Sequence, residues 1–199
     1  MSLRFLSLII IFLLSGFYLF QLYSSNHALS YLPEEGKVYT YKYPITDLFI
    51  SIHYTSIPSD DLTQKKNLLG TVTFEDGWET EIHLTESKNT TEITFVTSNT
   101  SPLILSKPLE VGDRWESNVL DPGTHSSSTE KYEIVDIIED YGFSFGTIEE
   151  VVQIKKTISS RDYVGTEYFY IASNIGLLYW DKIYEDDERV RYKELVDIK

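Results

Sequence analysis

The chain has 199 residues, a formal net charge of −14 at pH 7 and no cysteine. Within this sequence, the missing thiol excludes a disulfide framework, a thiolate zinc site, a cysteine nucleophile and a lipid anchor on cysteine. The acidic charge repels phosphate backbones, so we expect no nucleic-acid partner.

An apolar segment without charged residues, 5–23, follows Arg4. As a helix it would be about 28 Å long, which matches the hydrocarbon thickness of a bilayer. The first later charges, Glu34 and Glu35, are acidic, so the positive-inside tendency places the N-terminus in the cytoplasm. We predict cytoplasmic residues 1–4, a transmembrane signal-anchor at 5–23, a tether at 24–32 and an exported domain at 33–199. The alternative is a cleaved secretory signal, which would leave a secreted domain.

Alternation of apolar and polar side chains dominates the exported domain. In residues 147–158, for example, Ile148 and Ile154 fall on one side of a strand, while Glu149 and Lys155 fall on the other. The same reasoning predicts strands at 37–43, 48–54, 69–74, 78–84, 91–97, 131–138, 147–158, 166–172, 177–184 and 189–196.

Short connections without crossover helices favour an antiparallel meander of about ten strands. The fold class is therefore all-β, preceded by one N-terminal transmembrane helix. The pattern leaves three forms open: a curved half-barrel, a barrel or a two-layer sandwich. Between the strands we expect one turn of helix at 59–67, a loop at 121–129 and a tight turn at 185–187.

One hairpin can be predicted in register. A three-residue loop at 75–77 pairs Phe74 with Trp78 and Val72 with Thr80, which keeps apolar groups together on one face. Such a loop needs a positive φ at its last position, and Gly77 adopts that conformation without steric cost. We predict a type I turn with a glycine bulge.

A short phrase occurs twice, at 33–39 and 108–115: proline, an acidic residue, glycine and then a large aromatic residue that opens a strand. Together with Tyr132-Glu133-Ile134, Gly146-Thr147-Ile148, Tyr168-Phe169-Tyr170 and Ile175-Gly176-Leu177-Leu178, these phrases resemble a loose group of bacterial envelope proteins and lipoproteins. In that group a "PL-x-x-G-x-x-W" turn precedes a strand, and a tyrosine-rich strand precedes "x-G-L-V". The resemblance implies an all-β fold in the bacterial envelope and supplies no catalytic residue, so the anchor would lie in the cytoplasmic (inner) membrane.

The sequence contains no recognisable catalytic, cofactor-binding or metal-binding constellation. The four histidines have no ligand-type spacing, and no nucleophile motif or phosphate loop occurs. Glu149 and Glu150 are adjacent in a strand, so they point to opposite faces and cannot act together. If Glu150 points inward, it needs a partner such as a lysine, or it lies near the end of the sheet.

An aromatic group late in the chain is the best candidate for a binding surface. If the sheet curves into an open half-barrel, these residues are expected to line a groove, although packing within the core is the simpler interpretation. The candidate groove-lining residues are Tyr168, Tyr170, Tyr179, Trp180, Tyr184 and Tyr192.

Three functions follow from these observations. The first is a non-catalytic, membrane-anchored module that binds or helps to assemble a neighbouring envelope component. The second is a carrier or sensor of an apolar ligand, such as a lipid or peptide, in the concave face of the sheet. The third, the weakest, is a hydrolase of envelope polymers with two carboxylates about 5–10 Å apart.

Overall fold

The computed structural model describes most of the predicted exported domain. The described residues are 30–58, 66–87, 90–95, 103–106, 109–120, 127–143, 145–160, 164–184 and 188–199. The predicted anchor at 5–23, most of the tether, residues 59–65 of the helical turn expected at 59–67, and the turn at 185–187 lie outside these ranges. Within the described residues, no helix is long and apolar enough to cross a membrane.

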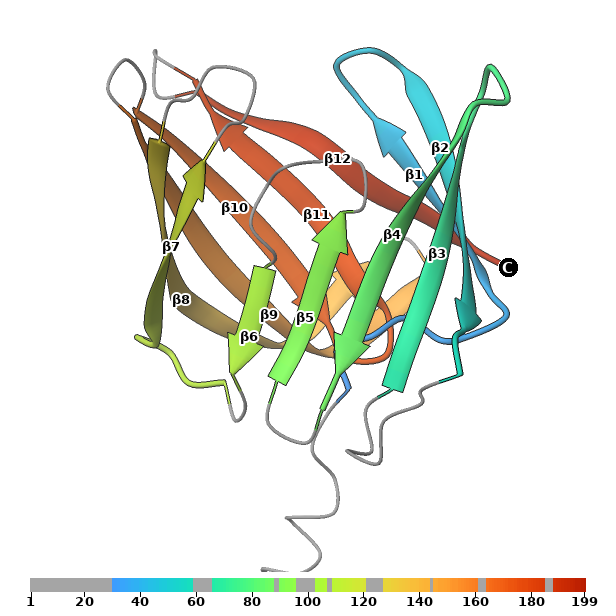
Figure 1. Cartoon of the computed structure of the whole chain (residues 1–199), viewed down its shortest axis with the longest axis horizontal. Coiled ribbons are helices and arrows are strands. Elements are labelled where there is room, and N and C mark those ends of the chain that lie inside the picture. Colours follow the sequence, from blue (N-terminus) through green and yellow to red (C-terminus); the bar gives the residue numbers. More distant parts are fainter. Residues whose placement is uncertain are drawn as a thin grey trace, which may run out of the picture.

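One antiparallel sheet of twelve strands contains every described strand (Figure 1). The strands are β1 (Val38–Tyr43), β2 (Leu48–Ser56), β3 (Lys66–Phe74), β4 (Glu79–Glu86), β5 (Thr90–Phe95), β6 (Leu103–Ser106), β7 (Arg114–Leu120), β8 (Ser127–Phe143), β9 (Gly146–Ser159), β10 (Val164–Ala172), β11 (Gly176–Ile183) and β12 (Arg189–Ile198). Their order across the sheet is β6-β5-β4-β3-β2-β1-β12-β11-β10-β9-β8-β7. Two meanders, β1–β6 and β7–β12, therefore meet at the central β1–β12 pair.

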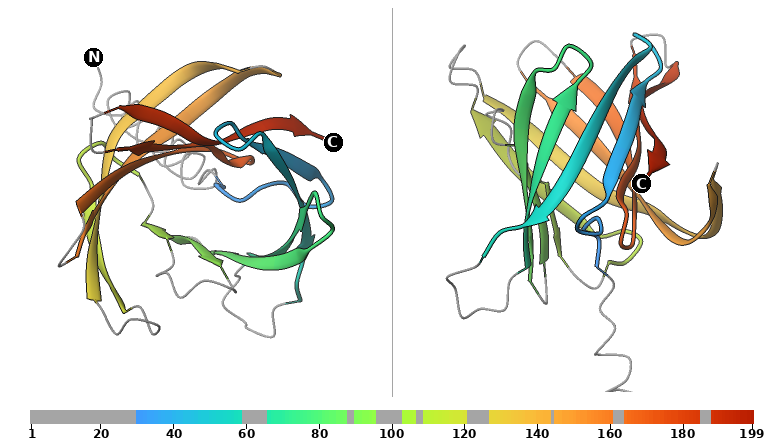
Figure 2. Two further views of the ribbon diagram at one scale, coloured as in Figure 1. Left: turned by 90° about the horizontal axis from the view of Figure 1, so that it is seen from above. Right: turned by 90° about the vertical axis from the view of Figure 1, so that its right-hand side faces the viewer.

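The sheet is curled and open. Figure 2 shows it bending around an inner face, and its two edge strands, β6 and β7, are not paired with each other. The prediction of an antiparallel meander is confirmed, and of the three forms left open the structure has the half-barrel rather than a closed barrel or two stacked sheets.

Apolar side chains on the inner face form the main core. Leu105 on the edge strand β6 packs in one cluster with Ile134 on β8 and Ile154 on β9, so these residues meet across the inside of the curve. Because side chains alternate between the two faces of a strand, these residues identify which other side chains lie on the inner face. Its fully buried members include Tyr39, Tyr41, Leu68, Leu105, Ile134, Ile154, Leu178 and Leu195.

A second layer covers part of the outer face. The far end of the β8–β9 hairpin folds over β10 and β11, so the ring centroids of Phe143 and Tyr179 lie 5.0 Å apart (Figure 2). Asp140 has a left-handed φ of 53°, which changes the direction of the hairpin. Val151 and Val152 consequently both have 0% exposure, whereas simple alternation predicts that one of the two side chains is exposed to solvent.

The predicted hairpin register is confirmed. The amide of Phe74 donates to the carbonyl of Trp78, Val72 is opposite Thr80, and Gly77 has a φ of 81°. Other predictions need correction. Strand β6 was not expected, and β3 begins at Lys66, inside the segment expected to be helical. Strand β7 was not among the predicted ranges, but it begins at Arg114, beside the aromatic residue that the phrase at 108–115 places at the opening of a strand. Strand β8 begins at Ser127, so the loop expected at 121–129 ends earlier, because Ser127 and Ser128 pair with Leu120 and Val119 of β7.

Gly70 provides a direct test of packing on the inner face. A Cβ at this position would lie 2.7 Å from Ile82 Cγ1 and 2.8 Å from Tyr54 Cε1. We expect Gly70→Val to lower the free energy of unfolding by about 1–3 kcal/mol, since neither neighbour can move without disturbing the core. Urea denaturation of the full chain measures this loss, and Thr71→Val, on the opposite face of the same strand, is the matched control. Equal stabilities of the two variants would contradict the packing.

Candidate functional site

A row of buried charges crosses the inner face from β8 to β11. Lys156 on β9 lies 2.7 Å from the carboxylate of Glu130 and 3.7 Å from that of Glu167, on β8 and β10. Lys182 on β11 continues the row, with Nζ 3.8 Å from Glu167. Register explains the arrangement, because Glu167 is directly opposite both lysines. We call these four residues the inner charge row.

Burial has the largest effect on the pKa of Glu167. Desolvation raises the pKa of Glu167, and Lys156 and Lys182 oppose that shift by favouring the carboxylate. Tyr132 donates a hydrogen bond of 2.7 Å to Glu130, and burial, followed by this bond, raises the pKa of Tyr132. The phenol therefore stays protonated and serves as a fixed donor to the carboxylate.

Lys193 on β12 is a buried cation of a different kind. Only 7% of the residue is exposed, and its Nζ lies 4.3 Å and 5.7 Å from the ring centroids of Tyr41 and Tyr43. No carboxylate forms an ion pair with it among the described residues. Burial alone lowers the pKa of Lys193 to about 8.

Trp180 on β11 is directly opposite Lys193. Its indole ring lies 4.6 Å from the ring of Tyr192, and Tyr192 in turn lies 5.5 Å from Tyr43. Lys182 Nζ lies over both Trp180 and Tyr192, at 4.7 Å and 3.9 Å. The buried Nε1 of Trp180 has no hydrogen-bond acceptor in the described part of the chain. Lys193, Trp180, Tyr192, Tyr41 and Tyr43 form what we call the aromatic–lysine cluster.

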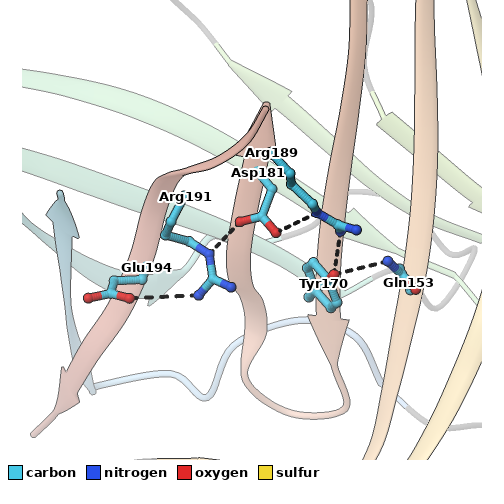
Figure 3. A network of polar contacts seen from close by, with 6 residues as sticks. All are labelled: Gln153, Tyr170, Asp181, Arg189, Arg191 and Glu194. Carbon is cyan, nitrogen blue, oxygen red and sulfur yellow. Dashed lines mark hydrogen bonds and ion pairs between the residues drawn. The ribbon is translucent and has the colours of Figure 1, made fainter. Parts of the chain in front are cut away.

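A polar network occupies the opposite, outer face (Figure 3). Buried Asp181 accepts from Arg189, at 3.0 Å, and from Arg191. Arg189 also donates to the hydroxyl of Tyr170, which accepts a 2.9 Å hydrogen bond from Gln153. This network ties β9 to β12 and leaves no unpaired charge around Asp181, which is typical of a structural role.

The six predicted groove residues do not gather on one face. Trp180 and Tyr192 lie in the aromatic–lysine cluster. Tyr168, Tyr170 and Tyr179 lie on the outer face, where the arginines of β12 stack on them. Tyr184 follows β11 and is exposed. That any of the six lines a groove stays a prediction.

The inner charge row and Lys193 were not predicted, although the sequence carries a signal for them. Lys156 is two residues after Ile154 and Lys193 is two before Leu195, so each lysine continues an apolar face. A charge at an apolar position of a strand is the pattern that could have identified them.

Residues 30–33 close one end of the inner face. Tyr31 donates a 2.6 Å hydrogen bond to Glu150, and Glu86 accepts from both the hydroxyl of Ser30 and the amide of Tyr31. Glu150 thus has a partner, but a tyrosine takes the place of the expected lysine. No group of three histidine, aspartate or glutamate residues in the described ranges could hold a metal ion.

Exposed apolar residues lie at the other end of the sheet, on two neighbouring hairpin ends, with Phe49 on the outer face and Trp78 packed on Phe74 of the inner face. The turn between β1 and β2 adjoins the turn between β3 and β4, because the amide of Phe49 donates to Glu75 at 3.1 Å. We call this group the tip patch. Its members are Ile45, Leu48, Phe49 and Trp78, with 54%, 50%, 37% and 55% exposure.

Comparison with known proteins identifies the fold. No protein-family model and no curated protein matches the sequence. Among solved structures, a "putative lipoprotein" from Parabacteroides distasonis has a TM-score of 0.58 and 14% identity over 86% of this chain and 99% of its own. A "putative exported protein with YmcC-like fold" from Bacteroides fragilis has a TM-score of 0.59 and 15% identity over the same shares. The chain shares the fold of these two proteins. At this identity the likeness extends to the fold alone.

Proposed function

We propose that this protein is a non-catalytic binding module of the bacterial cell envelope, held at the cytoplasmic membrane by residues 5–23. Two observations support this location. The apolar segment has the length and flanking charge of a signal-anchor. Both structural neighbours carry names that refer to exported proteins or lipoproteins.

The tip patch is the observation that carries the binding role. Scattered apolar residues are common on protein surfaces, whereas a group on adjacent turns is typical of an interaction site. The patch lies at the end of the sheet opposite Ser30–Pro33, where the chain arrives from the tether. Nine-residue strands such as β2, about 30 Å long, separate the two ends. A domain held at the membrane therefore presents the patch to another envelope protein rather than to the lipid that holds its anchor.

Replacing two residues of the tip patch tests this function. We expect Phe49→Ser combined with Trp78→Ser to reduce crosslinking of the full chain to its envelope partner by about tenfold, because aromatic anchors dominate small interfaces. Crosslinking in intact membranes, followed by mass spectrometry of the products, measures the yield. Val111→Ser combined with Val164→Ser is the matched control, since both valines are exposed apolar residues outside the patch.

Equal crosslinking by both double variants would contradict the role of the tip patch. A crosslinked product that contains only two copies of this chain would show that the tip patch binds a second copy of the chain rather than a different envelope protein. The anchor is tested separately, by the fate of an N-terminal tag. A tag that stays in the membrane fraction with the domain supports the signal-anchor, and release of a tag-free domain supports the cleaved signal.

A further inference from the structure

Strand β7 is an open edge of the sheet that lacks the usual protection against pairing. The other edge, β6, has only four residues, and Pro102, Lys107 and Pro108 flank it in the sequence. Short length, prolines and lysines prevent an edge strand from pairing with another chain. Strand β7 has seven residues and contains no proline, no lysine and no shift of register against β8. Among the described residues, no second strand lies beside it.

The backbone groups that β7 turns away from β8 can be assigned. The amide of Ile134 donates to the carbonyl of Asp113 at 3.0 Å, so these two residues form a hydrogen-bonded pair just before the strand. Hydrogen-bonded pairs occur at every second position of an antiparallel ladder, and the register with β8 continues without a shift. Arg114, Glu116 and Asn118 therefore direct their amide and carbonyl groups toward the open edge.

The side chains of β7 indicate which kind of segment fits beside it. On the inner side, Trp115 and Val119 are half-buried, and the ring of Trp115 stacks on that of Tyr132 with 5.2 Å between the centroids. An apolar side chain of an added strand would extend this contact. On the outer side, Glu116 is exposed and forms no ion pair in the described ranges. A neutral or basic side chain suits that side, because like charges on neighbouring strands repel.

We propose that β7 binds an extended segment of a neighbouring envelope protein, which adds to the sheet as a new edge strand. Main-chain hydrogen bonds give an added strand its affinity, and side chains at alternate positions give it specificity. The segment has apolar side chains on the inner side and neutral or basic side chains on the outer side. Strand β7 is separate from the tip patch, so the inference goes beyond the proposed function.

A second copy of this chain fits the edge less well. Antiparallel pairing of β7 with β7 of another copy reverses one domain, so the Ser30–Pro33 end of one copy would lie beside the tip patch of the other. Two copies held in one membrane would then have to point in opposite directions. Pairing of β7 with β6 of another copy keeps both domains upright but offers only the four residues of β6.

Site-specific photocrosslinking in intact membranes tests the edge. The crosslinker p-benzoylphenylalanine replaces Glu116 in one full-length protein and Asn118 in another, and mass spectrometry locates the captured residue of the partner. The control position is Val164, which is exposed but outside the edge. We expect positions 116 and 118 to capture one partner segment, at sites about two residues apart, because paired strands advance together. The control position should not capture this segment.

Proline at position 118 separates backbone pairing from side-chain contact. Asn118→Pro removes an N–H that faces the open edge and leaves the ladder to β8 intact, which an edge strand tolerates. Asn118→Ala is the matched control, because it loses the same 3.1 Å hydrogen bond with Thr129 but keeps the N–H. With the crosslinker at position 116, we expect Asn118→Pro to lower the yield by about tenfold and Asn118→Ala to change it by less than about twofold.

Thermal unfolding curves verify that Asn118→Pro folds, and the spacing of the captured sites decides the question without this variant. Equal yields from Asn118→Ala and a folded Asn118→Pro would overturn the proposal. So would captured sites that do not share one segment, capture of a second copy of this chain, or no capture at either position. The crosslinkers lie on β7 rather than at the tip patch, so failure here leaves the test of the proposed function standing.

Discussion

Replacing Lys156 with methionine is expected to lower the free energy of unfolding by about 3–5 kcal/mol at pH 7. Lys156 lies between Glu130 and Glu167, whose side chains are only 6% and 9% exposed. Methionine fills much of the same space but leaves two carboxylates buried without their shared cation. Lys182 is 3.8 Å from Glu167 and compensates only in part.

The loss of stability caused by Lys156→Met should be smaller at acidic pH. Burial already raises the pKa of Glu167 above its ordinary value of 4.5, and removal of Lys156 should raise it further. A carboxyl with a raised folded pKa stabilises the fold below its unfolded pKa, and that stability is lost as the pH rises through the folded pKa. The difference between variant and wild type should therefore be largest at neutral pH and narrow toward pH 4.5.

Urea denaturation of both proteins at pH 4.5 and pH 7 measures this difference. Lys155→Met is the matched control, because residue 155 is adjacent in sequence but faces outward. We expect the control to change stability by less than about 1 kcal/mol. Equal losses for the two variants, or a Lys156→Met loss that does not depend on pH, would show that the inner charge row does not contribute as described.

Lys193→Met is expected to have the opposite sign and to raise the free energy of unfolding by about 1–3 kcal/mol at pH 7. The wild-type ammonium group is buried against Tyr41 and Tyr43 and has no carboxylate partner in the described ranges. Removing an unpaired buried charge removes its desolvation penalty, while methionine keeps most of the apolar contact. Loss of stability in this variant would mean that the cation contributes more to the fold than its burial costs.

The pH dependence of the wild type tests the same point. The pKa of Lys193 falls from 10.5 to about 8 in the fold, so the unfolded chain binds more protons between these values. The stability of the wild type relative to that of Lys193→Met should therefore rise with pH from about 8, by roughly 2 kcal/mol up to pH 10.

Other groups near Lys193 set the useful range of that measurement. Burial raises the pKa of Tyr43 to about 12 and that of Tyr41 further, so both phenols stay neutral in the fold. Unfolded tyrosines begin to ionise near pH 9 and are half ionised at about pH 10, which favours the unfolded state of both proteins. The difference in the free energy of unfolding between wild type and Lys193→Met cancels this contribution, and a difference that stays constant between pH 7 and pH 10 would contradict the lowered pKa.

Most of the fold could be predicted because alternation in this chain matches burial. Ile82 and Leu84 point inward as their spacing indicates, and the positive φ of Gly77 follows from keeping Phe74 and Trp78 together. Strand β6 was not predicted because it has only four residues, and the extent of β7 was not predicted because it has few apolar residues, although the phrase at 108–115 indicates its start. Short strands at a sheet edge depend on their neighbour more than on their own pattern.

The position of Tyr192 in the aromatic–lysine cluster could not be predicted, for a geometric reason. A bulge at Tyr192 inserts a residue opposite the Trp180–Asp181 step, so the faces of β12 shift by one position. Tyr192 thereby joins Lys193 on the inner face, while Arg191 reaches the outer one. Counting by twos along the sequence cannot locate such an insertion, because it depends on the pairing with β11.

The entry point of the chain has a mechanical consequence. Ser30 accepts a 2.7 Å hydrogen bond from the amide of Asn174, and β1 lies at the centre of the sheet, paired with β2 and β12. Because ladder bonds are perpendicular to a strand, a pull along β1 loads many of them at once. Tension arriving through the predicted tether would therefore be resisted in shear by two ladders, whereas an edge strand would peel away one bond at a time.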